Sequence, residues 1–195
     1  FARTAGYTHY FGRTEYNEAN PDNKDFDGHW GIWDEKFFQF FGNTLSGFQQ
    51  PFAAALFSLS SHHPFAVPAE YEGVFPKGNK PIRQCIGYTD NALKLFFEKV
   101  SKEPWYKNTL FVFTADHTNS PERPEYETES GLFSVPVVFY QPGSDLKGFR
   151  KDVIAQQIDI MPTVLGYLGY DKPFVSFGCD LLNTPEIGRA SCRER

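Results

Sequence analysis

The sequence predicts an α/β fold with a mostly parallel sheet. Two apolar runs without polar alternation, residues 52–59 and 109–114, have the pattern of strands that are covered on both faces. Between them, apolar residues recur at multiples of three or four from Pro81 onward, which predicts a long helix with one stripe facing the core. Strand, helix and strand in this order form a βαβ unit, whose two strands run parallel.

The predicted stripe of the long helix consists of Ile82, Ile86, Leu93, Phe97 and Val100. A shorter amphipathic helix is predicted over Trp30–Phe41, after a loop over residues 17–29 that is rich in Asn, Asp, Pro and Gly. Upstream of that loop, Phe1–Gly6 has the pattern of a helix end closed by glycine, and a strand is expected over Tyr7–Phe11.

The part after residue 114 predicts one more strand and one more helix. Val135–Tyr140 is a strand pattern, and its internal proline indicates a sheet edge or a bulge. Residues 153–168 predict a final helix broken at Pro162. Residues 186–195 change abruptly to a basic composition with few apolar residues, so we expect them to be a non-native tail.

The composition excludes several classes of protein. The net charge is −5 and the basic residues are scattered, so no nucleic acid is expected as a partner. No run approaches the about 18 apolar residues of a membrane span, and the first residues lack a signal-peptide pattern. Membrane anchoring is therefore expected only through N-terminal segments outside this sequence. The three cysteines form neither a disulfide framework nor a metal-ligand spacing.

Polar clusters follow both predicted buried strands at the point where each strand ends. Asp116-His117 comes directly after the run 109–114, and a carboxylate beside an imidazole suits a divalent ion. His62 and His63 follow the other run, and only one of two successive side chains in an extended segment can face the same crevice. Ligands of open α/β sheets bind outside the carboxyl ends of the strands, so these clusters predict one site.

Three other polar groups favour structural interpretations or stay open. Residues 25–35 resemble a metal loop at first sight but lack the ligand spacing of a calcium hand, and a turn leading into a capped helix fits better. His9 and Arg13 carry no decisive pattern. The glutamates of residues 122–129 are expected to be solvated surface.

Four motifs, in this order along the chain, resemble the sulfatase and lipoteichoic acid synthase branch of the alkaline phosphatase superfamily. They are Trp-Gly-Ile-Trp-Asp34-Glu35, Leu-Ser-Ser-His62-His-Pro-Phe65, Thr-Ala-Asp116-His117-Thr-Asn119 and Gln-Ile-Asp159-Ile-Met-Pro162-Thr163. The likeness runs to about Asn183 and is greatest to synthase-like proteins of Gram-negative bacteria, Bacteroidetes especially. It implies a three-layer α/β/α sandwich, with residues 1–185 as the C-terminal portion of its catalytic domain.

The resemblance also implies a site. Asp116 and His117 match two ligands of a divalent metal ion, which could be Mn, Zn, Mg or Ca, and His62 matches the histidine that contacts the substrate's phosphate group. A further acidic ligand and a nucleophilic threonine would lie upstream of Phe1, so the chain by itself is expected to be inactive, with no catalytic nucleophile of its own. Asp159–Thr163 matches a structural helix.

The function implied is that of a metal-dependent phosphoglycerol transferase or phosphatase, which acts outside the cytoplasm, at the periplasmic face of the inner membrane or at the cell surface. Its substrate would be a phosphate or sulfate ester, lipid-linked ones included. One alternative is a sulfatase with an upstream formylglycine. The other is a non-catalytic binding domain with a degenerate site.

Overall fold

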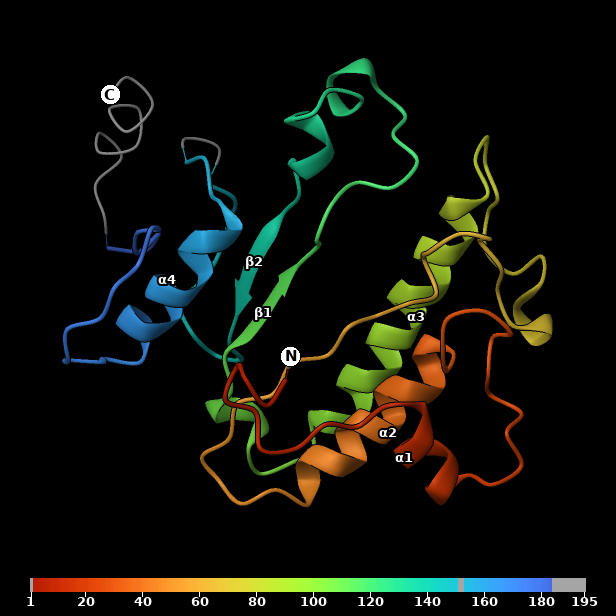
Figure 1. Ribbon diagram of the computed structural model, residues 1–195, viewed down its shortest axis with the longest axis horizontal. Coiled ribbons are helices and arrows are strands. Elements are labelled where there is room, and N and C mark those ends of the chain that lie inside the picture. Colours follow the sequence, from red (N-terminus) through yellow and green to blue (C-terminus); the bar gives the residue numbers. More distant parts are fainter. Residues whose placement is uncertain (1, 151–152, 184–195) are drawn as a thin grey trace. The chain divides into compact units, whose positions relative to one another are not determined.

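The computed structural model describes residues 2–150 and 153–183, and the chain divides into two compact units, residues 1–107 and 108–195. The first unit contains the helices α1 (Arg13–Ala19), α2 (Asp34–Ser46) and α3 (Ile82–Val100) (Figure 1). The second contains the strands β1 (Phe111–Thr114) and β2 (Val137–Tyr140) and the helix α4 (Ile160–Tyr167). Single 3-10 turns lie at Ala69–Tyr71, Tyr106–Asn108, Pro124–Tyr126, Gly131–Phe133 and Gln157–Asp159. No helix in the described part is long and apolar enough to cross a membrane.

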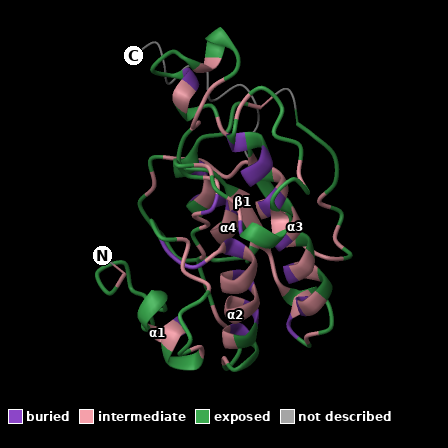
Figure 2. Cartoon of the chain, turned by 90° about the vertical axis from the view of Figure 1, so that its right-hand side faces the viewer, coloured by how far each residue is buried: buried purple, intermediate pink, exposed green. Residues whose placement is uncertain are grey.

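The core of the first unit lies between α2 and α3, where most of its buried side chains gather (Figure 2). Phe38 of α2 meets Phe96 of α3 edge to face, with 6.2 Å between ring centroids. Gly42 lets the helices approach closely, because a Cβ at this position would lie 3.2 Å from Val100 Cγ1. Burial of each large apolar side chain stabilises such a pair by about 1.5–3 kcal/mol.

Both predicted helices of this unit are present, but α2 spans Asp34–Ser46 and not the predicted Trp30–Phe41, and the predicted stripe of α3 is wrong in its middle. The buried residues of α3 are Ile82, Gln84, Cys85, Tyr88, Ala92, Phe96 and Val100. Ile86, predicted to face the core, is 55% exposed, and Leu93 and Phe97 are only half-buried. The polar hydroxyl of Tyr88 is tolerated in the core because it accepts a hydrogen bond from the backbone of Glu35 at 3.2 Å.

The predicted strand over residues 52–59 is wrong for the described structure, and so is the βαβ unit built on it. The segment runs as an extended trace without a ladder partner (Figure 1), and Ala53, Ala54, Ala55 and Phe57 are exposed. Its apolar pattern belongs to a strand that neighbours would cover, and such neighbours do not occur among the described residues. The N-terminal prediction also fails, because Tyr7–Phe11 forms no strand and is followed by α1.

The second unit contains both strands predicted for it, but they pair with each other in antiparallel order. Phe111 lies opposite Tyr140 and Thr114 lies opposite Val137. Pro136 immediately precedes β2, where its missing N–H breaks no ladder hydrogen bond. Pro162 does not break the final helix as predicted, because α4 begins only at Ile160 and the proline falls in its first turn, where no backbone donor is needed. The expected non-native tail lies outside the described residues.

Candidate functional site

The Asp116–His117 pair lies just after β1, as predicted, and only Ala115 separates it from the strand. Both side chains are about half exposed, 58% for Asp116 and 49% for His117. The backbone N–H of His117 donates to Asp116 Oδ1 at 2.8 Å, and Asp116 Oδ2 lies 3.5 Å from His117 Nε2. The chain therefore turns here, and two adjacent residues bring a carboxylate and an imidazole together.

The donor atoms of this pair fit two positions around one divalent ion. His117 Nδ1 lies 3.1 Å from the carbonyl oxygen of Thr118, and because a carbonyl can only accept, this hydrogen bond places the proton on Nδ1. In a neutral imidazole this leaves the lone pair on Nε2, and a metal-bound histidine commonly donates its other ring N–H to a carbonyl in this way. Two ligands at about 2.1 Å from a tetrahedral ion lie about 3.4 Å apart. The separation of 3.5 Å between Asp116 Oδ2 and His117 Nε2 is close to that spacing.

Gln157 holds the turn that carries the pair, and sequence reasoning missed it. Its Nε2 donates to the carbonyl oxygens of Ala115 at 2.7 Å and of Asp116 at 3.0 Å. The 3-10 turn of Gln157 is in turn anchored by Asp159, which is 2% exposed and accepts the backbone N–H of Gln156 and of Cys179, each at 2.8 Å. The structural role expected for Asp159 agrees with these contacts.

The described residues contain no complete metal site. No group of three or more His, Cys, Asp or Glu side chains that could hold an ion occurs within residues 2–150 and 153–183. The glutamates after the pair do not approach it as a cluster and are exposed, as predicted: Glu122, Glu125, Glu127 and Glu129. Asp116 and His117 can therefore supply two ligands, and the remaining ones are not among the described residues.

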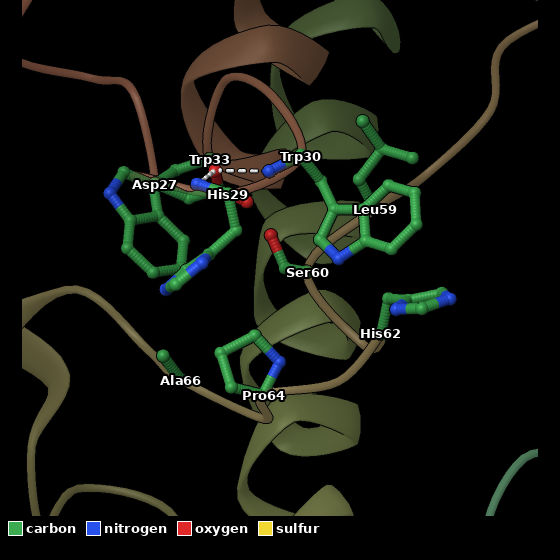
Figure 3. Close-up of a pocket in the computed structure, with 9 residues that line it drawn as sticks. All are labelled: Asp27, His29, Trp30, Trp33, Leu59, Ser60, His62, Pro64 and Ala66. Atoms are coloured by element: carbon green, nitrogen blue, oxygen red, sulfur yellow. Dashed lines mark hydrogen bonds between the residues drawn. The ribbon is translucent and has the colours of Figure 1, made fainter.

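His62, the predicted phosphate contact, lies in the first unit at the rim of a small hollow. Figure 3 shows the hollow with Trp30 and His62 on one side, His29 and Trp33 on the other, and the hydroxyl of Ser60 between them. Its volume of about 10 Å³ is close to room for one water molecule. A substrate group would therefore meet the exposed edge of His62 and could not enter the hollow.

The loop before α2 packs against the His62 segment, which the sequence did not predict. Asp27 Oδ1 accepts three backbone N–H groups, those of His29, Trp30 and Gly31, at 2.8, 2.8 and 3.0 Å. The structure confirms a turn leading into a helix, but α2 begins at Asp34 without a side-chain cap, so the predicted capped start is wrong. Asp27 has a structural role in this turn through Oδ1.

Asp34 is a buried anchor for the same segment. It is 2% exposed, and its Oδ1 accepts the backbone N–H groups of Leu59 at 2.9 Å and Ser60 at 3.2 Å. Oδ2 accepts the hydroxyl proton of Thr89 on α3 at 2.8 Å, and the backbone N–H of Asp34 donates to Ser60 Oγ at 3.0 Å. One carboxylate thus ties together α2, α3 and the residues just before His62.

Glu35 beside it is held ionised by its neighbours. Burial acts to raise the pKa of Glu35, but hydrogen bonds from Tyr71 and Lys36 outweigh burial and lower it. A negative charge in the first turn of α2 is also favourable to the helix dipole.

His9 and Arg13, which the sequence left open, have packing partners in the structure. The imidazole of His9 lies 5.6 Å from the ring of Phe48, and the guanidinium of Arg13 lies 3.5 Å from the ring centre of Phe26.

The predicted site residues belong to two groups in different units. One group surrounds His62 in the first unit, and the other is the Asp116–His117 pair in the second.

Comparison with known proteins gives relatives with consistent names. A lipoteichoic acid synthase-like protein, YvgJ of Bacillus subtilis, is 27% identical over 176 residues, which are 79% of this chain and 28% of that protein. Lipoteichoic acid synthase 1 of the same organism is 26% identical over 198 residues, 91% of this chain and 30% of the synthase. The chain thus spans less than a third of the length of these relatives.

A solved structure shows the same fold. A protein of the alkaline phosphatase superfamily from Vibrio parahaemolyticus superposes with a TM-score of 0.74 at 26% identity, covering 92% of this chain and 43% of that one. The predicted α/β fold of the alkaline phosphatase type is thereby confirmed, although the described strands alone form only an antiparallel pair. The family model described as Sulfatase matches residues 1–170. The chain belongs to the Sulfatase family.

Proposed function

We propose that this chain is part of a divalent metal-dependent phosphotransferase or phosphatase of the phosphoglycerol transferase type. The geometry of Asp116 and His117 carries the proposal, because Asp116 Oδ2 and His117 Nε2 lie 3.5 Å apart just after β1, and His117 Nδ1 is bonded to a backbone carbonyl oxygen. The names of the relatives, a lipoteichoic acid synthase and a lipoteichoic acid synthase-like protein, support the phosphoglycerol class.

The residues divide the chemistry between them. When bound, a divalent ion supplies Lewis-acid polarisation of the transferring group and lowers the pKa of a bound hydroxyl. Asp116 contributes a hard anionic ligand and His117 a neutral one, a set that suits Mn²⁺ or Zn²⁺ and also allows Mg²⁺ or Ca²⁺ through the carboxylate. His62 contacts an oxygen of the phosphate group through Nε2. The acidic ligand and the threonine nucleophile belong to parts of the protein outside these 195 residues.

The substrate in this proposal is a phosphate ester, including a lipid-linked one, and the site lies outside the cytoplasm. Membrane attachment would be provided by segments outside this sequence. Transfer of a phosphoglycerol unit needs an acceptor hydroxyl, whereas transfer to water would make the protein a phosphatase.

A second candidate function is hydrolysis of sulfate esters, favoured by the match of residues 1–170 to the Sulfatase family. Sulfate and phosphate groups are both tetrahedral and anionic, so the same metal ligands and the same histidine would serve either. The third candidate is a non-catalytic binding domain in which Asp116 and His117 hold no ion.

The decisive experiment is calorimetric titration with Mn²⁺ and Zn²⁺ of the 195-residue chain and of a longer form extended to the length of its relatives. We expect binding by the longer form that is lost in Asp116→Ala, and much weaker binding by the short chain. Asp145→Ala is the matched control, because this aspartate lies exposed in the same unit and its loss should leave binding unchanged.

Turnover of p-nitrophenyl phosphate and p-nitrophenyl sulfate by the longer form then separates the candidates. Faster cleavage of the phosphate that depends on Asp116 supports the proposal, and faster cleavage of the sulfate supports the second candidate. Equal metal binding with and without Asp116 would refute both enzymatic candidates and leave the binding domain.

A further inference from the structure

The loop formed by residues 25–33 is rigidly built, although much of it is exposed. Phe26 and Ile32 form an antiparallel bridge, and backbone hydrogen bonds join Asp27 N to Gly31 O at 2.8 Å and Trp33 N to Asp25 O at 2.9 Å. Together with the three N–H groups that Asp27 Oδ1 accepts, these contacts fix the backbone of Trp30. The loop therefore presents the Trp30 side chain in one defined direction.

The Trp30 side chain is not fixed by burial, because it is 53% exposed. Its indole N–H donates to the carbonyl oxygen of His63 at 2.8 Å. Its ring lies against the imidazole of His62, with 4.0 Å between ring centroids and 52° between ring planes. Both contacts of the indole are thus with the His62–His63 segment, beside the hollow shown in Figure 3.

His62 uses the same carbonyl oxygen as Trp30. His62 Nδ1 lies 3.1 Å from His63 O, and since a carbonyl only accepts, Nδ1 is the donor. The two lone pairs of one oxygen therefore bind the indole and the imidazole together, and the contact between the two tilted rings restricts their orientations. Nε2 is left as the ring nitrogen of His62 that can meet a ligand, and it donates to an anionic oxygen when it carries a second proton, as in the imidazolium.

We propose that Trp30 is a positioning residue for His62, which holds the imidazole so that Nε2 meets the anionic phosphoryl or sulfuryl group of the ester substrate. This inference rests on the proposed function, in which His62 contacts that group. Without the indole, the imidazole of His62 keeps its hydrogen bond to His63 O but loses the ring contact, and it gains freedom about its side-chain torsions. Immobilising a side chain before binding improves affinity, because the ordering cost no longer falls on the complex.

The test uses the longer form of the protein, with inorganic phosphate as the probe. We expect Trp30→Leu to weaken phosphate binding about threefold to tenfold, the range for freeing one immobilised side chain. Trp30→Phe should recover part of this loss, because a phenyl ring keeps a ring contact with His62 but cannot donate to His63 O. Phe57→Leu is the matched control, since this aromatic residue is 67% exposed in the segment before His62 and no ring contact joins the two.

A double-mutant cycle distinguishes positioning from a general structural effect. If Trp30 acts through His62, Trp30→Leu should cause no additional loss in a His62→Ala background. Proton NMR of the His62 ring gives a second readout, because the indole ring current should shift its signals in the wild type and not in Trp30→Leu.

The possible failures are separable. Additive losses from the two substitutions, or unchanged phosphate affinity in Trp30→Leu while His62→Ala weakens binding, would overturn the role of Trp30 alone. Unchanged affinity in His62→Ala would overturn the role of His62 in the proposed function, and the inference with it.

Discussion

Replacing Asp34 should separate a structural anchor from the candidate site that it supports. Its carboxylate is 2% exposed and accepts hydrogen bonds from Leu59 N, Ser60 N and Thr89 Oγ at 2.9, 3.2 and 2.8 Å. In Asp34→Ala these three donors lose a buried partner; Ser60 is itself buried, and Leu59 and Thr89 are partly buried. Each unsatisfied donor costs about 1–3 kcal/mol. Water entering the space relieves part of this cost, so we expect a loss of about 3–5 kcal/mol in the free energy of unfolding.

Asp34→Asn should lower the free energy of unfolding much less than Asp34→Ala, and this difference is the more specific part of the prediction. The amide oxygen can still accept the N–H groups of Leu59 and Ser60. The hydroxyl of Thr89 can rotate and accept a proton from the new NH₂ group, because a hydroxyl is both donor and acceptor. Only the charge assistance of the hydrogen bonds is lost, which corresponds to about 1–2 kcal/mol.

The assay is urea unfolding followed by tryptophan fluorescence, with Asp90→Ala on the exposed face of α3 as the matched control. Hydrogen exchange gives the local readout, because the amides of Leu59 and Ser60 should lose protection in Asp34→Ala and largely keep it in Asp34→Asn. Equal destabilisation by the two substitutions, or a loss below about 1 kcal/mol in Asp34→Ala, would refute the reasoning about unsatisfied donors.

Two other features lead to predictions. Gln157→Leu should weaken divalent metal binding by the longer form about tenfold, because the amide no longer holds the carbonyl groups of Ala115 and Asp116. This is the lower end of the range for losing a contact that supports a metal ligand. Calorimetry with Mn²⁺ measures the affinity, and an unchanged affinity would show that the turn keeps its conformation without Gln157. Burial raises the pKa of the Cys85 thiol from 9.0 to about 11, with the charge of Asp34 adding to it. Because the folded pKa is raised, the stability due to the neutral thiol is complete below pH 9 and is lost as the pH rises to about 11. Thermal unfolding between pH 8 and pH 11 should therefore show a steeper decline in the wild type than in Cys85→Ala, and parallel curves would contradict the buried thiol.

Helices and strands with a strong local pattern could be predicted from the sequence. The amphipathic spacing predicted α2 and α3, and the apolar runs predicted β1 and β2. The predicted stripe of α3 failed at Ile86 because hydropathy alone does not identify Tyr88 and Cys85, whose polar atoms find acceptors or donors inside the core, as buried residues. A local sequence pattern predicts that a helix forms, but which face of the helix is buried depends on the element that packs against it.

Features that join distant parts of the chain could not be predicted. The Asp116–His117 pair was found because its signal is local, a polar dipeptide directly after a strand. Trp30 and His62 are 32 positions apart, and nothing in the sequence around either residue indicates that their rings meet. The hydrogen bond between Gln157 and Ala115 could not be predicted for the same reason, because nothing in the sequence around Gln157 distinguishes its side chain from that of an exposed glutamine.

The extended segment of residues 52–59 has a consequence for the time course of folding. Its apolar pattern suits a central strand, yet no ladder partner lies among the described residues. Pairing between segments that are distant in sequence is slow, because loop closure must precede the contacts that reward it. Before such pairing, the backbone N–H and C=O groups of this segment can form hydrogen bonds with a strand of another molecule. We expect the segment to be among the last to become protected during refolding, and the first to make contacts between molecules at high protein concentration.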